Sequence, residues 1–166
     1  EYHSYEKTMK EIGIAYLGEC NHSVKLTHNG EKNMLTYGIY LASSDASNIN
    51  VCPKSKMCRE SCLVGSGYAK IDALAHNNKV LNARIIKTRL FFANRNLFMT
   101  LMIKEINRAI NKAKRLGMEF SVRLNCTSDI NPTVFMYEGK NILELYPNVS
   151  FYDYTKVKSH WKVAEK

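Results

Sequence analysis

Hydrophobic and polar residues follow two patterns along the chain, one typical of buried strands and one of amphipathic helices. Met34–Leu41 is apolar on both faces, which favours a strand covered on both sides of a sheet. Met118–Leu124 alternates and then becomes apolar, and Val149–Tyr154 is a third segment rich in aromatic and β-branched residues. We therefore expect three core strands.

Helical periodicity occupies the interval between the first two strands. It predicts a short helix over Ala69–His76, a second over Asn78–Phe92 and a third over Leu97–Leu116, which Asn94 or Asn96 would cap. A glycine follows the last residue of the third helix, as at many helix ends. One face of that helix has core spacing. Its members are Phe98, Met102, Ile106, Ala109, Ile110 and Ala113.

The remaining segments are less regular. Ile12–Leu17 is either a short strand or the end of a helix that begins near Tyr5. An Asn-Gly pair at positions 29 and 30 predicts a hairpin between His22–Thr27 and Asn33–Ala42. Further along, we expect Pro132–Tyr146 to be partly helical, with its clearest helical piece at 141–145.

The element order is strand, cysteine loop, helices, strand, polar loop, helix, strand. This alternation predicts an α/β fold with parallel strands and right-handed crossovers. We expect one domain over 1–166, with 1–32 as an N-terminal extension or hairpin and 33–166 as the βα core. The chain stops in W-K-V-A-E-K, the opening turns of a helix, so we expect it to be a piece of a longer protein.

Composition limits the class of protein. The chain has 166 residues, of which 45% are hydrophobic and 23% charged, as in a globular domain. No apolar run has membrane-spanning length and the first residues do not form a signal peptide, so we expect no membrane partner and a cytoplasmic location. The net charge of +9 suggests an acidic partner, a nucleic acid or a phosphorylated small molecule, or else serves only solubility.

Three of the five cysteines lie together, at Cys52, Cys58 and Cys62, in a C-x5-C-x3-C array after the first core strand. An odd number of cysteines excludes a complete disulfide framework within one chain, and such clusters in intracellular proteins usually bind metal. Three thiolates can hold a zinc ion with a distant fourth ligand, or three irons of a [4Fe-4S] cluster with one iron left open. Unligated buried thiols are the third alternative. We favour the cluster.

Polar residues follow the other two strands. Because the carboxyl ends of parallel strands share one edge, these residues should lie near the cysteines. In the loop after the second strand, the residues that could bind a cofactor or substrate are Asn125, Thr127, Ser128 and Asp129. The same residue types also form Asx-type turns. After the third strand, Asp153 and Lys156 could be an acid–base pair, a substrate clamp or a plain ion pair.

Basic residues on the predicted helices provide an alternative function. A zinc-stabilised module that binds nucleic acid without catalysis would use such residues to contact phosphates. The candidates are Lys79, Arg84, Lys87, Arg89, Lys104 and Arg108. A solvated helix face is the simpler explanation of such a stripe.

Three motifs carry a resemblance to a known family. C-P-K-S-K-M-C-R-E-S-C-L, followed by R-L-N-C-T-S-D-I and F-Y-D-Y-T-K, resembles the bacteriophage family named Gene product 88. The resemblance spans about Asn33–Lys166 and implies a phage protein that acts in a bacterial host. Members usually continue beyond this C-terminus.

More distantly, the layout resembles radical SAM enzymes, in which a cluster loop follows the first strand of a partial barrel. In that family a polar motif after the second strand contacts S-adenosylmethionine, and Asn125–Asp129 has the matching position. The resemblance implies a partial parallel (βα) barrel and cluster-dependent redox or radical chemistry. The cysteine spacing differs from the usual C-x3-C-x2-C, so cluster binding carries over more directly than cleavage of S-adenosylmethionine.

Overall fold

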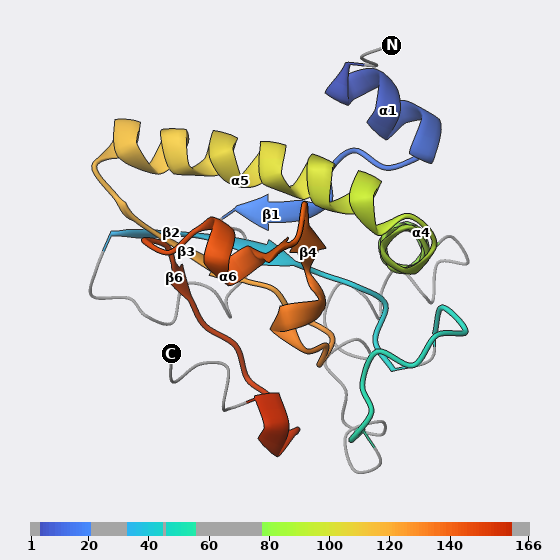
Figure 1. Ribbon diagram of the computed structural model, residues 1–166. Coiled ribbons are helices and arrows are strands. Elements are labelled where there is room, and N and C mark those ends of the chain that lie inside the picture. Colours follow the sequence, from blue (N-terminus) through green and yellow to red (C-terminus); the bar gives the residue numbers. More distant parts are fainter. Residues whose placement is uncertain (1–3, 21–32, 45, 56–77, 161–166) are drawn as a thin grey trace.

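The computed structural model describes residues 4–20, 33–44, 46–55 and 78–160, in which a sheet has the strand order β1-β2-β3-β6 (Figure 1). β1 (Gly18–Cys20) is antiparallel to β2 (Met34–Ile39). β2 is parallel to β3 (Glu119–Arg123), which in turn is parallel to β6 (Ser150–Phe151). The prediction of an α/β fold with parallel core strands is confirmed, with an antiparallel edge strand added.

Two of the three helices predicted between β2 and β3 fall in the part of the chain that the structure describes, and both are present. They are α4 (Lys79–Ala93) and α5 (Arg95–Leu116). Asn78 and Asn94 cap their N-termini, because each side-chain oxygen accepts a hydrogen bond from a backbone N–H of the first turn. α5 ends where Gly117 adopts φ +63°, a left-handed conformation that glycine reaches without a steric penalty.

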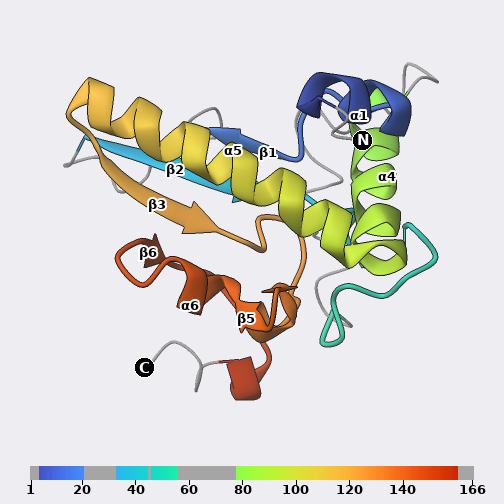
Figure 2. The ribbon, with the colours of Figure 1, turned by 45° about the horizontal axis from the view of Figure 1, so that its top comes forward.

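α5 lies across one face of the sheet (Figures 1 and 2). Its predicted apolar stripe forms the core: Phe98, Met102, Ile106, Ala109 and Ala113 are buried, and Ile110 is partly buried. The sheet contributes Tyr37, Ile39 and Val122 to the same cluster. Alternate strand residues point to opposite faces, so Tyr37 and its register partner Val122 share the α5 face.

The opposite face of the sheet is polar where the sequence predicted an apolar one. Thr36 lies opposite Ser121 in register, and their hydroxyl oxygens are 2.8 Å apart. The next pair on this face is Gly38 and Arg123. Thr36, Ser121 and Arg123 are all buried. The central strands therefore separate an apolar layer under α5 from a layer of buried polar groups.

The connection from β3 to β6 contains more than the predicted helix. The helical piece is α6 (Ile142–Leu145), which begins at a capping box formed by Asn141 and Glu144. Ahead of it lie a short 3-10 helix, η2 (Pro132–Val134), and a two-stranded hairpin that was not predicted. The hairpin strands are β4 (Met136–Tyr137) and β5 (Lys140–Asn141).

The N-terminal segment is helical first, in agreement with one of the two alternatives. α1 (Tyr5–Ile12) ends at Gly13, which has φ +84°. The segment then enters the sheet as β1, earlier than the predicted strand at 22–27, which lies outside the described residues together with the predicted helix at 69–76. At the other end, β6 is shorter than the predicted strand, because pairing with β3 is confined to Ser150 and Phe151.

The described strands do not close into a barrel, and the partial barrel stays a prediction. Among the helices of the described part of the chain, none combines the length and the apolar character needed to cross a membrane.

Candidate functional site

The loops that follow β2, β3 and β6 lie side by side at the carboxyl edge of the parallel strands. The backbone N–H of Cys126 donates to the carbonyl of Ile39 at 3.1 Å, and that of Asp129 donates to the carbonyl of Val51 at 2.8 Å. The N–H of Asn125 donates to Oδ2 of Asp153 at 2.9 Å. Segments far apart in the sequence thus meet here, as parallel strands require.

Cys52 lies where two of these loops touch. Its Sγ accepts a hydrogen bond from the backbone N–H of Ser44 at 3.4 Å and is 3.9 Å from the carbonyl oxygen of Thr127. The side chain is half-buried. Cys58 and Cys62 lie outside the described residues, and within those residues no group of three His, Cys, Asp or Glu side chains gathers as a metal site would.

The loop 125–129 is held by its own side chains. Oδ1 of Asn125 accepts from the Ser128 hydroxyl at 2.8 Å and from the Ile130 N–H at 2.9 Å, while Nδ2 donates to the Ile130 carbonyl. The Thr127 hydroxyl donates to the Leu41 carbonyl at 2.6 Å. These contacts give Asn125, Thr127 and Ser128 a structural role, although a bond to the backbone five residues on is longer in range than an Asx turn. Ligand binding by this loop stays a prediction.

Asp129 organises the loop after β6. Oδ1 accepts from the Thr155 hydroxyl at 2.5 Å and lies 3.3 Å from Nδ1 of His160. Oδ2 accepts from the backbone N–H of Lys156 at 3.1 Å. The sequence analysis did not identify His160 as a candidate residue, because its partner is a single carboxylate 31 positions away and not a second histidine at helical spacing.

Asp153 pairs with Arg123 and not with Lys156 among the residues that the structure describes. Its Oδ1 lies 3.7 Å from Nε of Arg123 and accepts from the Tyr154 N–H at 3.0 Å. Burial raises the pKa of Asp153 above its ordinary value of 3.8, against the opposing effects of its hydrogen bonds and of Arg123. Asp153 therefore positions the backbone of the neighbouring loop, whereas the Lys156 side chain is exposed.

Arg123 is the main residue at this edge that the sequence interpretation missed. It is only 5% exposed, and its Nε makes no hydrogen bond within the described part of the chain. The guanidinium carbon lies 5.0 Å from the ring centroid of Tyr154, a side chain that is 73% exposed. Its position in the sequence could have identified Arg123 as a candidate, because it is a charged residue at the end of a predicted apolar strand.

The six basic residues of the alternative function do not share one exposed surface. Lys79, Arg89 and Arg108 are exposed, but Arg108 forms an ion pair with Glu6 at 3.5 Å. Arg84 lies 5.5 Å over the Tyr40 ring, and Lys104 is half-buried.

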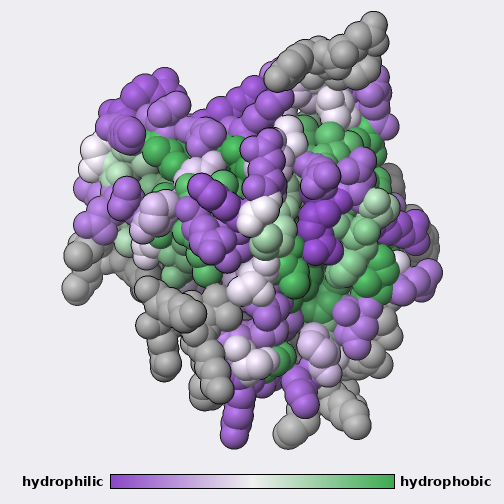
Figure 3. Space-filling model, viewed as in Figure 1, coloured by the Kyte–Doolittle hydropathy of each residue, from purple (hydrophilic) through white to green (hydrophobic). Residues whose placement is uncertain are grey.

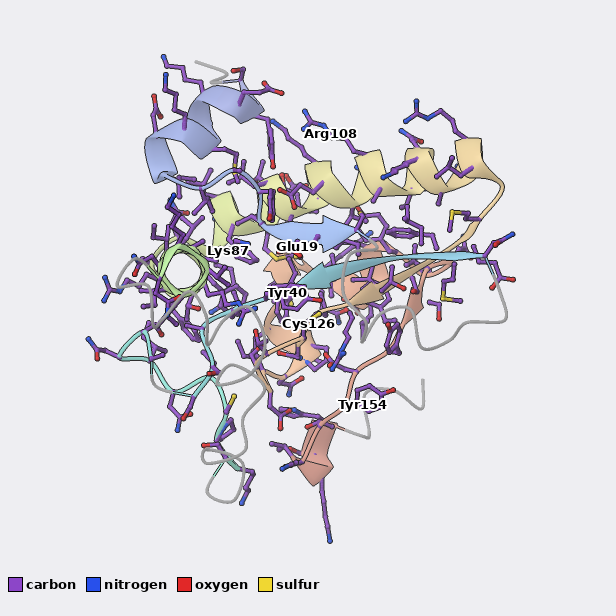
Figure 4. The ribbon with its side chains drawn as sticks, turned by 180° about the vertical axis from the view of Figure 1, so that it is seen from behind. Glu19, Tyr40, Lys87, Arg108, Cys126 and Tyr154 are labelled. Carbon is purple, nitrogen blue, oxygen red and sulfur yellow. The ribbon has the colours of Figure 1, made fainter. Side chains whose placement is uncertain are left out.

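Lys87 is the member of that set that has to be corrected. It is 4% exposed, its Nζ lies 4.9 Å from the Tyr16 ring centroid, and burial lowers the pKa of its ammonium group. A buried ammonium cannot contact phosphates at the surface. Figure 4 shows Lys87 on α4 beside the sheet, with Arg108 on the α5 side and Tyr154 on the opposite side.

Comparison with known proteins tests the resemblances. No curated protein and no solved structure matches the chain, so the likeness to radical SAM enzymes rests on motif order alone. A family model described as Gene product 88 matches residues 14–166, which extends the resemblance noted from the motifs towards the N-terminus and includes β1. The chain belongs to the Gene product 88 family.

Proposed function

We propose that the chain binds an iron–sulfur cluster through Cys52, Cys58 and Cys62 and uses it for redox or radical chemistry at the carboxyl edge of the sheet. The observation that supports this most is the position of Cys52. Its sulfur lies against the carbonyl of Thr127, in the loop that follows the neighbouring parallel strand. A group bound at Cys52 would therefore lie beside the edge at which α/β proteins bind their ligands.

The surroundings of Cys52 fit a metal-bound sulfur. A backbone N–H donated to Sγ, as from Ser44, favours the thiolate form and adjusts the potential of a cluster. Half-burial limits access of water and still leaves a path for a ligand. A [4Fe-4S] cluster held by three thiolates supplies single electrons and one open iron, where a substrate or S-adenosylmethionine can bind.

The chain's own residues would hold the substrate. Arg123 presents a buried guanidinium whose Nε lacks an acceptor among the described residues, and a carboxylate or phosphate oxygen of a substrate would supply one. Asp153 keeps the Arg123 side chain and the Asn125 backbone in place. The net charge of +9 for the whole chain favours an anionic substrate.

The finer assignments rest on the motif resemblance. They are a radical SAM-like reaction, with S-adenosylmethionine as a second ligand, a partial (βα) barrel and action in the cytoplasm of a bacterial host.

Metal analysis tests the proposal. For protein purified without oxygen, we expect a brown colour and about four irons with matching sulfide per chain. Cys52→Ala and Cys58→Ala should each lose them. Cys20→Ala is the matched control and should keep them, because Cys20 lies on the edge strand β1.

Two outcomes would contradict the proposal. Colourless protein with one zinc per chain would exclude the redox function and favour the zinc-stabilised nucleic-acid module. The slope of nucleic-acid affinity against salt concentration would then test that module, because phosphate contacts make the slope steep. Protein without metal would exclude both functions.

A further inference from the structure

A cavity lies on the α5 side of the sheet, where α1, β1 and α5 bound it. Its volume is about 840 Å³, within the size range of small-molecule sites. The described residues that line it include Tyr37 of β2 and none from the loops at the carboxyl edge. Cys52, the described member of the candidate cluster site, is not among these residues.

One wall of the cavity is the side chain of Glu105, whose acceptor sites are already used. Oε1 accepts from the Tyr5 hydroxyl and from the Leu17 N–H, and Oε2 accepts from the Tyr37 hydroxyl and the Gly18 N–H. Four donors leave this carboxylate little capacity to attract a cation or another donor. A ligand in the cavity must bind to other groups.

The other charged groups among the described lining residues are three cations on α5 and the carboxylate of Glu19 on β1. Arg108, Lys112 and Arg115 lie at spacings of four and three on α5, so they share one side of the helix, and all three line the cavity. Figure 3 shows hydrophilic side chains along the surface where α5 runs. The ion pair between Arg108 and Glu6 joins side chains that are 58% and 74% exposed, and such exposed pairs are weak and easily exchanged for a ligand anion.

A thiol lies on the opposite wall. Cys20 of β1 is half-buried and lines the cavity. Burial raises the pKa of the Cys20 thiol, and the nearby charge of Lys112 opposes this effect. Because Cys20 and Lys112 both line the cavity, we expect an anion bound there to change access to Cys20.

We propose that this cavity binds a small phosphorylated molecule, with its phosphate groups against Arg108, Lys112 and Arg115. Among the described lining residues these three cations outnumber the two carboxylates, Glu19 and Glu105, so the potential on the α5 side of the cavity favours an anion. Guanidinium and ammonium groups form their strongest hydrogen bonds with phosphate oxygens. The proposed phosphate site does not use Cys52, which is not among the described residues that line the cavity.

Calorimetric titration of the full chain with inorganic pyrophosphate tests the proposal. Lys112→Glu removes one cation from the cavity, and the matched control Lys114→Glu makes the same charge change two positions along the helix, where the side chain lines a different hollow. Both residues are exposed, so both variants should fold. We expect Lys112→Glu to weaken binding at least about tenfold and Lys114→Glu less than about threefold.

Equal losses in the two variants would overturn the proposal in favour of a diffuse basic surface. Absence of saturable binding to the unmodified chain would also overturn it. The Cys58→Ala variant should bind pyrophosphate as the unmodified chain does, so a failure of metal binding and a failure of the cavity remain distinguishable.

Alkylation of Cys20, followed by peptide mass mapping, gives a second readout. Pyrophosphate should slow the modification of Cys20 in the unmodified chain and in Lys114→Glu, but not in Lys112→Glu. Sodium chloride at the same ionic strength should have no such effect, because screening alone does not occupy the cavity. Equal protection by chloride would overturn the assignment of this cavity as the binding site.

Discussion

Glu105 and Asp153 are both largely buried carboxylates, and their surroundings differ. Glu105 accepts four hydrogen bonds, from Tyr5, Leu17, Gly18 and Tyr37. Asp153 accepts two backbone N–H groups and lies 3.7 Å from a guanidinium nitrogen. One carboxylate has its acceptor capacity filled by well-aligned donors, and the other has an ion pair of poor geometry.

The difference separates a structural centre from a candidate ligand site. A buried polar group that is fully hydrogen-bonded stabilises one arrangement of the chain. Glu105 in this way fastens the N-terminal segment and β2 to α5. A buried donor without an acceptor, such as Nε of Arg123, costs stability and is tolerated where a ligand completes it.

Glu105→Gln should have the largest effect on stability. The amide keeps one acceptor oxygen and replaces the other with an NH2 group. The tyrosine hydroxyl at that position can rotate to accept from the NH2 group, but the backbone N–H of Leu17 or Gly18 loses its acceptor, and the charge that strengthened all four hydrogen bonds is removed. We expect the free energy of unfolding in urea to fall by about 2–4 kcal/mol. Glu11→Gln, at an exposed position, is the control and should change it by less than about 0.5 kcal/mol. Equal effects of the two substitutions would mean that the hydrogen bonds of Glu105 stabilise the fold no more than an exposed carboxylate does.

Gly18→Ala should disrupt the same hydrogen-bonded group around Glu105, by displacing the side chain of Tyr37. A Cβ on Gly18 would lie 2.2 Å from Cζ of Tyr37, so the ring and its hydroxyl must move away from Glu105. Overpacking of this kind costs about 1–3 kcal/mol, which a urea titration can measure. Gly139→Asn is the control, because that position has open space and a left-handed φ that asparagine tolerates. A neutral Gly18→Ala variant would show that Tyr37 can be repositioned freely.

Asp153→Asn should have the smallest effect, about 1 kcal/mol at neutral pH, because burial of the charge offsets the attraction of Arg123. The folded pKa of Asp153 lies above its unfolded value, so its contribution to stability is greatest at low pH. That contribution falls as the pH rises above about 3.8 and through the folded pKa. The difference between the two proteins, measured by urea unfolding at several pH values, should therefore shrink as the pH rises. A difference that grows with pH would mean that the ion pair outweighs burial.

The sequence predicted those features that depend on neighbours in the chain. Residues at helical spacing identify the buried face of α5, and Asn94 and Gly117 mark its ends. The parallel strands β2 and β3 were also predicted, and so was the meeting of their loops at one edge. A pattern of apolar residues carries this information because secondary structure and burial are local properties.

The two carboxylate centres depend on long-range pairing that no local pattern contains. Glu105 and its partner Tyr5 are 100 positions apart, and Asn125 and Asp153 are 28 apart. Glu105 lies seven residues after Phe98 and four before Ala109, at the border of the apolar face of α5, and the donors brought by distant segments explain why a carboxylate is buried there. The polar face of the sheet was missed for the same reason. Thr36 and Gly38 form part of a buried polar layer only because β3 places Ser121 and Arg123 beside them.

Asn94 ends α4 and begins α5, so a single residue forms the whole corner between two long helices. Each residue added within the first turn of α5 would rotate the following side chains by about 100° and advance them by about 1.5 Å. Glu105 would then turn away from its donors, and the basic wall of the cavity would turn with it. Length variation among relatives should therefore avoid this corner and collect in other connections of the fold.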